Sequence, residues 1–376
     1  MTRLRSLFDI PDNVCYLNAA YMGPMPRSAV SAAQEAAQQK CHPWDITLID
    51  FFQPTETIRQ LVAPLFGVTY KDIAIVPSAS YGLATAAQNM TLTAGQEIVI
   101  LAEQFPSNVY VWRRLAERHK AKVRVVTRTA DQSWTQAILA AIGPQTGIVA
   151  CAQTHWVDGG YVDLEAVSDA LAIHGGELVL DLSQSLGVQA IDLARVRPAF
   201  AVAVGYKWLI GPYTLAYLYA RPDKQSGVPL EEGWINREGS RNFARLVDCR
   251  ETFGEGAQRY DMGERSNMQL IPQALPGLSL LADLGPKQAA DLISQWTDQI
   301  VDRAAGLGVI ADAPHIRSRH YLGLTLPPSA PDDLLEKLKA RQVHVSQRGT
   351  RLRVTPHIYT TQADIDRFIA ALADSL

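Results

Sequence analysis

Lys207 is the residue of this sequence that most needs a chemical explanation. It lies inside the otherwise apolar and aromatic stretch AFAVAVGYKWLIGPYTLAYLYA (199–220). The two parts of this stretch, 199–204 and 214–220, have the length and composition of buried strands, and glycines and a proline separate them. An ammonium is rarely buried without a partner, so Lys207 at a strand end either reaches solvent or serves in chemistry. A desolvated lysine can act as a nucleophile and as a base.

Two more predicted strand ends carry polar groups. Asp181 ends the apolar run of ELVLDLSQSLG (177–187), where a carboxylate needs a cation or a hydrogen-bond donor to stay ionised. Ser78, Ala79 and Ser80 follow the apolar run 73–76 and precede a predicted helix. Hydroxyls and free N–H groups at a helix start bind anions. The alternatives are ordinary helix capping by a serine and an ion pair or a cap at Asp181.

The three strand ends together fit one ligand. Ligands of open α/β sheets bind beyond the carboxyl ends of the strands, so we expect these ends to converge. Pyridoxal 5'-phosphate carries a phosphate for the serine turn, a ring nitrogen for Asp181 and an aldehyde for Lys207. The lysine would form a Schiff base and move the α-proton of a substrate, while the aspartate keeps the ring nitrogen protonated. We therefore predict a pyridoxal-phosphate site with Lys207 and Asp181 as its catalytic residues.

Apolar runs alternate with helix-period segments between about residues 70 and 220, which predicts an α/β fold with a mostly parallel, doubly wound sheet. The predicted strands are 73–76, 97–101, 122–127, 147–151, 177–180, 199–204 and 214–220. The predicted helices between them are 80–90, 108–119, 132–141 and 163–173. These elements would place the three polar strand ends on one edge of the sheet.

The composition changes after residue 220, which predicts a second domain. Residues 221–263 are rich in Gly, Arg and Glu, and an apolar helix is predicted at 270–284. Further helices at 294–307 and 362–372 and strands at 321–325 and 351–354 follow. We expect a large cofactor-binding domain at 15–260 and a smaller C-terminal α+β domain at 261–376. Residues 1–14 are expected to belong to the smaller domain.

Composition and charge narrow the class of protein. The 376 residues are 47% hydrophobic and 19% charged, with a formal net charge of -3, which argues against nucleic acid and membrane surfaces as partners. No signal-peptide core or long uncharged apolar segment is present, so a cytoplasmic location is expected. The four cysteines show no CxxC spacing, so neither a disulfide framework nor a metal site is predicted.

The segments DLSQSLG and GYKWLIGP resemble those of fold-type I pyridoxal-phosphate enzymes of the class V aminotransferase branch, which includes cysteine desulfurases, kynureninases and isopenicillin N epimerase-like proteins. The resemblance extends from YLNAAYMGPMPRSAV (16–30) to LRVTPHIYTTQADIDRF (352–368). It implies Lys207 as the Schiff-base lysine, Asp181 as the pyridine partner, and Ala79 and Ser80 in the phosphate turn. It also implies a homodimer with the active site at the subunit interface.

Further site residues follow from this resemblance. It implies that Gln184 approaches the phenolic oxygen of the cofactor, that Phe105 stacks on its ring, and that Tyr206 reaches the phosphate, unless Tyr206 is a core residue. In THWVDGG (154–160), Trp156 and Asp158 are candidates for one polar contact. The full set of predicted cofactor contacts is Ser78, Ala79, Ser80, Phe105, Asp158, Asp181, Ser183, Gln184, Tyr206 and Lys207.

The substrate is predicted to be a small amino acid or amine. The resemblance implies that Arg353 binds its α-carboxylate, with Arg351 as the competing choice. No cysteine follows Cys249, so the persulfide mechanism of cysteine desulfurases is not expected. The leading hypothesis is an aminotransferase, and the alternative is a lyase that cleaves C–C or C–S bonds as kynureninases do. A non-catalytic nucleotide-binding protein is a remote alternative, because GEGAQR (254–259) lacks the required glycine pattern.

Overall fold

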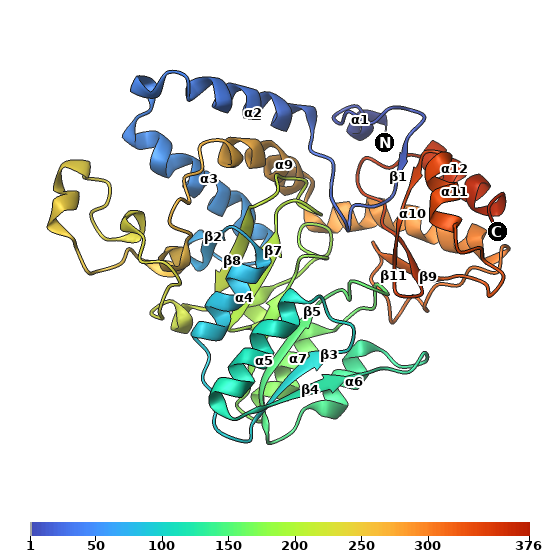
Figure 1. Cartoon of the computed structure of the whole chain (residues 1–376), viewed down its shortest axis with the longest axis horizontal. Helices are drawn as coiled ribbons and strands as arrows, with labels where there is room; N and C mark the ends of the chain where they lie inside the picture. Colours follow the sequence, from blue (N-terminus) through green and yellow to red (C-terminus); the bar gives the residue numbers. More distant parts are fainter. Residues whose placement is uncertain (1) are drawn as a thin grey trace.

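The large sheet forms the centre of the molecule in the computed structural model, which describes residues 2–376 (Figure 1). Its strand order is β2-β8-β7-β6-β5-β3-β4. Every neighbouring pair is parallel except those of β8, which is antiparallel to both β2 and β7. The strands are β2 (Ile73–Val76), β3 (Glu97–Leu101), β4 (Lys122–Val126), β5 (Thr146–Ala152), β6 (Glu177–Asp181), β7 (Phe200–Val204) and β8 (Ala216–Ala220). The predicted α/β fold with a mostly parallel sheet is confirmed.

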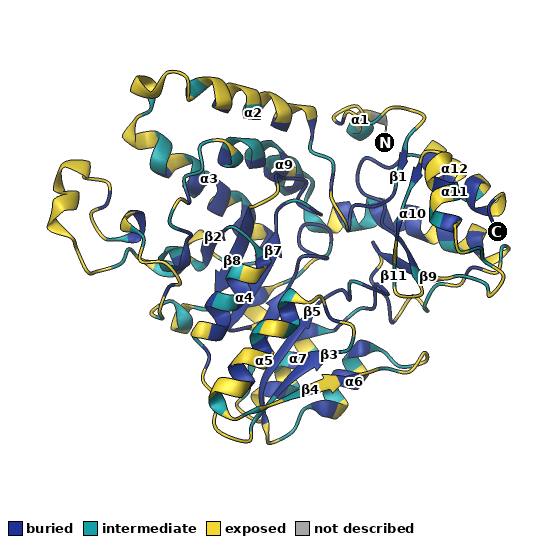
Figure 2. Ribbon diagram, viewed as in Figure 1, coloured by how far each residue is buried: buried dark blue, intermediate teal, exposed yellow. Residues whose placement is uncertain are grey.

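Helices cover both faces of this sheet, because successive strand residues point to opposite sides. Val99 packs in one buried cluster and Ile98 in the other. The first cluster contains residues of α3 (Leu48–Phe66), α6 (Trp134–Ala141), α7 (Leu164–Ala172), the short α8 (Leu193–Val196) and α9 (Leu270–Leu284). The second cluster contains residues of α4 (Ala79–Gln88) and α5 (Ser107–His119). Figure 2 shows the strands buried between these layers, with the exception of the edge strand β4, which is largely exposed, as is α2 (Arg27–Gln39).

The C-terminal residues build a smaller sheet with the order β11-β12-β9, which is antiparallel throughout. Its strands are β9 (Leu322–Thr325), β11 (Ser346–Arg348) and β12 (Arg351–Val354). The helices that accompany it are α10 (Pro286–Ala305), α11 (Leu334–Ala340) and α12 (Gln362–Ala373). Near the N-terminal helix α1 (Thr2–Arg5), strand β1 (Cys15–Tyr16) pairs in parallel with β10 (Val343–His344). Cys15 and Leu17 pack in the buried cluster formed by residues of α10, α11, α12 and the small sheet. The division of the chain into two domains stays a prediction.

The helix predicted at 294–307 begins eight residues earlier, at Pro286. Pro286 occupies the first helical turn, where its missing N–H costs nothing, and Gly285 precedes it at a φ of 77°. Of the helices within residues 2–376, α1, α2, α3, α8 and α11 were not predicted, and α3 contains Pro54 and Pro64. Proline disfavours the interior of a helix, so the sequence pattern does not indicate a helix at these residues. The packing of α3 against α9 and the sheet stabilises the helix in the folded protein. No helix within residues 2–376 has the length and apolar character needed to cross a membrane.

Candidate active site

The amino group of Lys207 lies at the carboxyl end of β7, in the turn that leads to β8. This turn is closed by backbone hydrogen bonds from Gly205 to Leu215 and from Gly211 to Gly205, at 2.8 and 2.9 Å. Lys207 is 8% exposed, and its Nζ has no hydrogen bond to any residue that the structure describes. Burial lowers the pKa of Lys207 to about 8; the carboxylate of Asp181 opposes this shift, and two nearby arginines add to it. The amine is therefore desolvated and loses its proton at a lower pH than an exposed lysine does.

Asp181 lies at the end of β6, the strand next to β7. Its Oδ1 accepts a hydrogen bond from the backbone N of Ser183 at 3.0 Å, and no cation of residues 2–376 lies within ion-pair distance. The Ser183 hydroxyl in turn accepts a bond from the N–H of Val204 at 3.4 Å. A buried carboxylate with capacity to accept more hydrogen bonds is the group that a protonated ring nitrogen requires.

The turn after β2 presents the N-terminus of α4. The Ser78 hydroxyl caps this helix by accepting from the backbone N of Tyr81 at 3.1 Å, and the Ser80 hydroxyl donates to that of Ser107 at 2.8 Å. The N–H groups of the first helical turn have no acceptor inside the helix. The capping role of Ser78 and an anion site at Ala79 and Ser80 are therefore compatible.

These groups line one cavity of about 370 Å³. A second cavity of about 350 Å³ shares Phe105, Trp156, Tyr206, Lys207 and Tyr213 with the first. The predicted residues that line the first cavity are Ser78, Ala79, Ser80, Phe105, Trp156, Asp181, Ser183, Gln184, Tyr206 and Lys207. Arg353 lines the second cavity. The structure thus brings the predicted site together, with the exception of Asp158.

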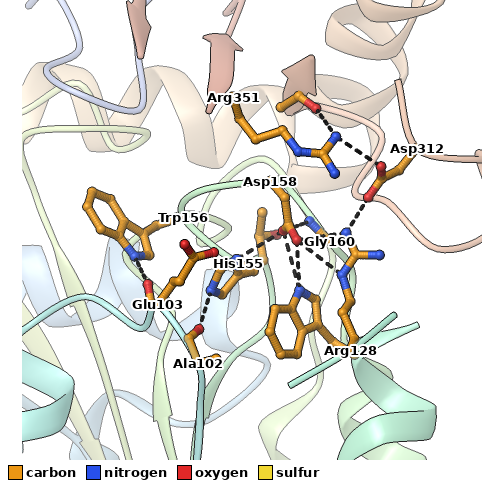
Figure 3. Close-up of polar contacts among 12 residues, drawn as sticks. Ala102, Glu103, Arg128, His155, Trp156, Asp158, Gly160, Asp312 and Arg351 are labelled. Carbon is orange, nitrogen blue, oxygen red and sulfur yellow. Dashed lines mark hydrogen bonds and ion pairs between the residues drawn. The ribbon is translucent and has the colours of Figure 1, made fainter. Parts of the chain in front are cut away.

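Asp158 does not line either cavity, and its role as a cofactor contact stays a prediction. Figure 3 shows its carboxylate turned into a polar cluster, where it accepts from Arg128 at 2.7 Å, His155 at 2.9 Å, Trp134 at 3.1 Å and the N–H of Gly160 at 2.8 Å. Burial raises the pKa of Asp158, but His155 and Arg128 outweigh it and hold this pKa well below its usual range. Sequence could not separate Asp158 from Trp156, because both lie in one short loop.

Trp156 is the residue of this loop that reaches the cavities. Its ring packs edge-on against Phe105 with centroids 5.2 Å apart, and its Nε1 donates to the backbone oxygen of Glu103 at 2.6 Å (Figure 3). Its own backbone oxygen accepts from Nη1 of Arg353 at 3.3 Å. The cluster around Asp158 therefore holds the loop that contacts Arg353.

Arg353 and Arg351, the two candidates for binding the substrate carboxylate, differ in their hydrogen-bond and ion-pair partners. Arg351 donates to Asp312 at 3.2 Å and to the Thr325 hydroxyl at 2.6 Å, and Asp312 also pairs with Arg128 (Figure 3). Arg351 lines neither cavity. Arg353 is 1% exposed, and its Nη2 is buried with no hydrogen-bond partner in the described structure. An unpaired buried guanidinium nitrogen beside a cavity is suited to an anionic ligand.

Several residues that line the cavities were not predicted. They are Gln104, Asn108, Thr154, Tyr213 and Thr214 in the first cavity, and Tyr21 and Arg348 in the second. Tyr213 and Thr214 directly follow the GP pair after the lysine, which was a usable signal. Tyr21 and Arg348 come from distant segments, and nothing local in the sequence marks them.

The donor set fits pyridoxal phosphate. The helix N-terminus and serines can hold its phosphate, Asp181 its ring nitrogen, and Lys207 its aldehyde. This group would satisfy the amine of Lys207, which has no hydrogen bond, and the remaining acceptor capacity of Asp181, which has no cationic partner among residues 2–376. Gln184 is oriented by its own bonds: its Oε1 accepts from Trp208 at 2.9 Å and its Nε2 donates to the backbone oxygen of Ala20 at 3.2 Å. No cluster of metal-ligating side chains occurs in residues 2–376.

The class-V aminotransferase family model matches residues 48–368, so the chain belongs to this family. Class V enzymes depend on pyridoxal phosphate, which confirms the predicted cofactor at the level of the family. Isopenicillin N epimerase from Streptomyces clavuligerus is 25% identical over 390 residues, with 98% of this chain and 96% of that protein covered. A kynureninase from Deinococcus radiodurans is 26% identical over 273 residues, with 69% and 63% covered.

Many solved structures are similar in fold, among them the following two. The apo structure of cysteine desulfurase from Thermococcus onnurineus NA1 has a TM-score of 0.85 and 17% identity, covering 99% of this chain and 97% of that chain. The cystine C–S lyase C-DES, in complex with its reaction product cysteine persulfide, has a TM-score of 0.84 and 19% identity, covering 96% and 98%. At these identities the likeness establishes the architecture and leaves the reaction open.

Proposed function

We propose that this protein is a pyridoxal-phosphate-dependent enzyme that acts on an amino acid through Lys207, and that its reaction is transamination. The observation that carries the proposal is the unpaired, desolvated amine of Lys207 in one cavity with Asp181, next to the unpaired Nη2 of Arg353. Family membership supports an enzyme over the non-catalytic nucleotide-binding alternative.

Each residue has a defined task in this proposal. Bound pyridoxal phosphate supplies an electron sink that stabilises negative charge developing at the substrate α-carbon. Lys207 takes the proton from that carbon, because its lowered pKa of about 8 leaves a useful fraction of neutral amine near neutral pH. Asp181 accepts a hydrogen bond from the protonated ring nitrogen. Arg353 binds the α-carboxylate and so orients the α-hydrogen toward the lysine.

A lyase that cleaves a C–C or C–S bond is the second candidate. The kynureninase relative favours it, as do the aromatic side chains around the lysine: Nζ of Lys207 lies 5.5 Å from the ring centroid of Phe105 and 5.7 Å from that of Tyr206. A desulfurase mechanism that uses a cysteine nucleophile is not supported, because neither cavity has a cysteine among its lining residues.

The test is the visible absorption spectrum of the cofactor-loaded protein before and after addition of a panel of L-amino acids. Transamination predicts loss of the visible band in proportion to the keto acid formed. A lyase predicts a retained band with accumulation of a cleaved fragment. A protein that shows no visible band after addition of the cofactor would contradict the proposal.

The control for this test is a pair of lysine variants. Lys207→Ala should lose the band and all turnover while its circular dichroism stays unchanged. Lys287→Ala removes a lysine on the surface of α10 whose side chain is 87% exposed, and it should behave as wild type. Turnover at the wild-type rate by Lys207→Ala would rule out the proposed role.

We further propose that the protein is a homodimer. Exposed apolar side chains support this, among them Trp44, Ile49, Phe243 and Val247, with Trp44 75% and Val247 82% exposed. Sedimentation should give twice the mass of one chain. A monomer at micromolar concentration would contradict this part of the proposal and would leave the cofactor test unaffected.

A further inference from the structure

Arg348 is a second arginine beside the proposed substrate carboxylate site. It pairs in register with Arg351 on β12, and Arg353 pairs with Ser346, two residues before Arg348. Paired and alternate residues of an antiparallel ladder share a face, so all three arginines leave the same face of the hairpin. Arg351 is bound by Asp312, whereas Arg348 and Arg353 both line the second cavity.

Arg348 has no acidic partner in this position. It forms no ion pair with any residue of 2–376, and its hydrogen bond is to the backbone oxygen of Gln347, at 2.7 Å. Its guanidinium is half-buried and lies 5.7 Å from the centroid of the Trp156 ring. The pKa of Arg348 is lowered, first by burial and then by the charge of Arg353. A partly desolvated cation next to another cation is unfavourable unless an anion joins them.

The charges of the second cavity are unbalanced. Its lining includes Lys207, Arg348 and Arg353 and no carboxylate. Asp181 lines the first cavity, where the ring nitrogen of the cofactor would use it. One substrate α-carboxylate compensates Arg353 and leaves the charge of Arg348 without an anion. A second negative group on the substrate would compensate it.

We infer that Arg348 forms a second anion subsite, so that the substrate is an amino acid with an additional carboxylate on its side chain. This inference rests on the proposed function. Diagonal neighbours on paired strands are about 7 Å apart at their Cα atoms, so two guanidiniums from these positions can bind two carboxylates of one molecule. The aromatic rings of Trp156, Phe105 and Tyr21 line the space around them and would enclose the methylene groups between the carboxylates.

The experiment compares aspartate and glutamate with asparagine and glutamine, which are similar in shape and lack the second charge. The readout is the concentration of each amino acid that gives the half-maximal change in the visible band of the holoenzyme. Wild type should respond to the dicarboxylic acids at concentrations at least about tenfold lower, as expected for a charge-assisted pair. Arg348→Gln should remove this preference and leave the amides within about twofold of wild type.

Two further variants separate the possible outcomes. Arg353→Gln should weaken binding of all four amino acids, because all carry an α-carboxylate. Arg341→Gln removes the same charge outside the cavities, at the end of α11, and should keep the preference. Equal loss of acids and amides in Arg348→Gln would assign both arginines to the α-carboxylate and overturn the second subsite. A wild-type response to neutral amino acids alone would also overturn it, whereas a band that responds to no amino acid would overturn the proposed function as well.

Discussion

Nε of Arg353 donates a hydrogen bond to the hydroxyl of Ser346, 3.0 Å away and directly opposite in the β11–β12 pair. Ser346 in turn donates to Oδ1 of Asn18 at 2.9 Å, and Nη1 of Arg353 is engaged by the backbone oxygen of Trp156. These contacts hold a long side chain in one conformation, so its entropy is lost on folding and not on substrate binding. The remaining nitrogen, Nη2, is free for a ligand.

Arg353→Gln should therefore raise KM for amino acids strongly. The loss of a buried charge-assisted pair costs about 2–5 kcal/mol, and steady-state kinetics will measure it. Ser346→Ala keeps the guanidinium but frees its Nε, which should cost about 1 kcal/mol in the same assay. An unchanged KM in Arg353→Gln would move the carboxylate site elsewhere.

Capture of pyridoxal phosphate by the cofactor-free protein should accelerate as the pH rises through about 8, which is the lowered pKa of Lys207. The physical reason is that the neutral amine attacks the aldehyde and the ammonium does not. Stopped-flow measurement of the visible band against pH gives this midpoint. A midpoint near 10.5, the ordinary value of a lysine, would show that Lys207 is not desolvated.

The lowered pKa of Lys207 also predicts a difference in the free energy of unfolding between wild type and Lys207→Met that depends on pH. Urea unfolding of the cofactor-free proteins measures this difference. Between pH 8 and 10.5 the unfolded chain binds a proton at Lys207 that the folded chain has released. Wild type should therefore gain up to about 3 kcal/mol relative to the variant across this window as the pH rises. A constant difference would contradict the prediction.

Asp158→Asn should destabilise the fold by about 3 kcal/mol, because it removes a buried charge from the ion pair with Arg128 and from the bond to His155. The pKa of Asp158 is held low, so this stabilisation is fully present above the usual carboxyl pKa and is lost as the pH falls through the lowered one. Thermal unfolding at pH 7 and pH 3 measures the first part of this loss, because pH 3 lies between the usual and the lowered pKa. Asp169→Asn removes an exposed carboxylate paired with Arg195 and should change stability by less than about 1 kcal/mol.

Asp261→Asn should lower both stability and cofactor affinity. Asp261 binds both terminal nitrogens of the buried Arg59, at 3.0 and 2.5 Å, and accepts from the N–H of Ile75 at 2.7 Å. Neutralising it leaves the buried Arg59 and Arg265 with only the longer contacts to Glu56, at 3.7 and 3.4 Å, as compensation, at a cost of about 3–5 kcal/mol. Ile75 lies on β2, which leads into the Ser78 turn, so we expect weaker cofactor retention. Urea unfolding and cofactor titration test both effects, with Asp291→Asn, whose side chain is 45% exposed, as the control.

The lysine and the aspartate could be predicted because their signals are local. Each follows a short apolar run, and the strand ends of a parallel sheet meet at one edge whatever the remaining contacts are. The sequence by itself thus determined the α/β class, the strands of the large sheet, and the convergence of Lys207, Asp181 and the serine turn in one cavity, whereas β1, β10 and β11 were not predicted.

The tertiary structure decided which side chains of a given strand or loop line the cavities, because this depends on partners far away along the chain. Arg351 and Arg353 are alternate residues of one strand and look alike in sequence, but Asp312 binds the first and the cavity receives the second. Trp156 and Asp158 lie in one loop, but Trp156 lines the cavities, whereas the carboxylate of Asp158 pairs with Arg128 outside them. Arg348 joins the cavity through strand pairing that no local pattern encodes. The physical reason is that side-chain electrostatics depend on neighbours far away along the chain, whereas hydrophobic periodicity depends on adjacent residues.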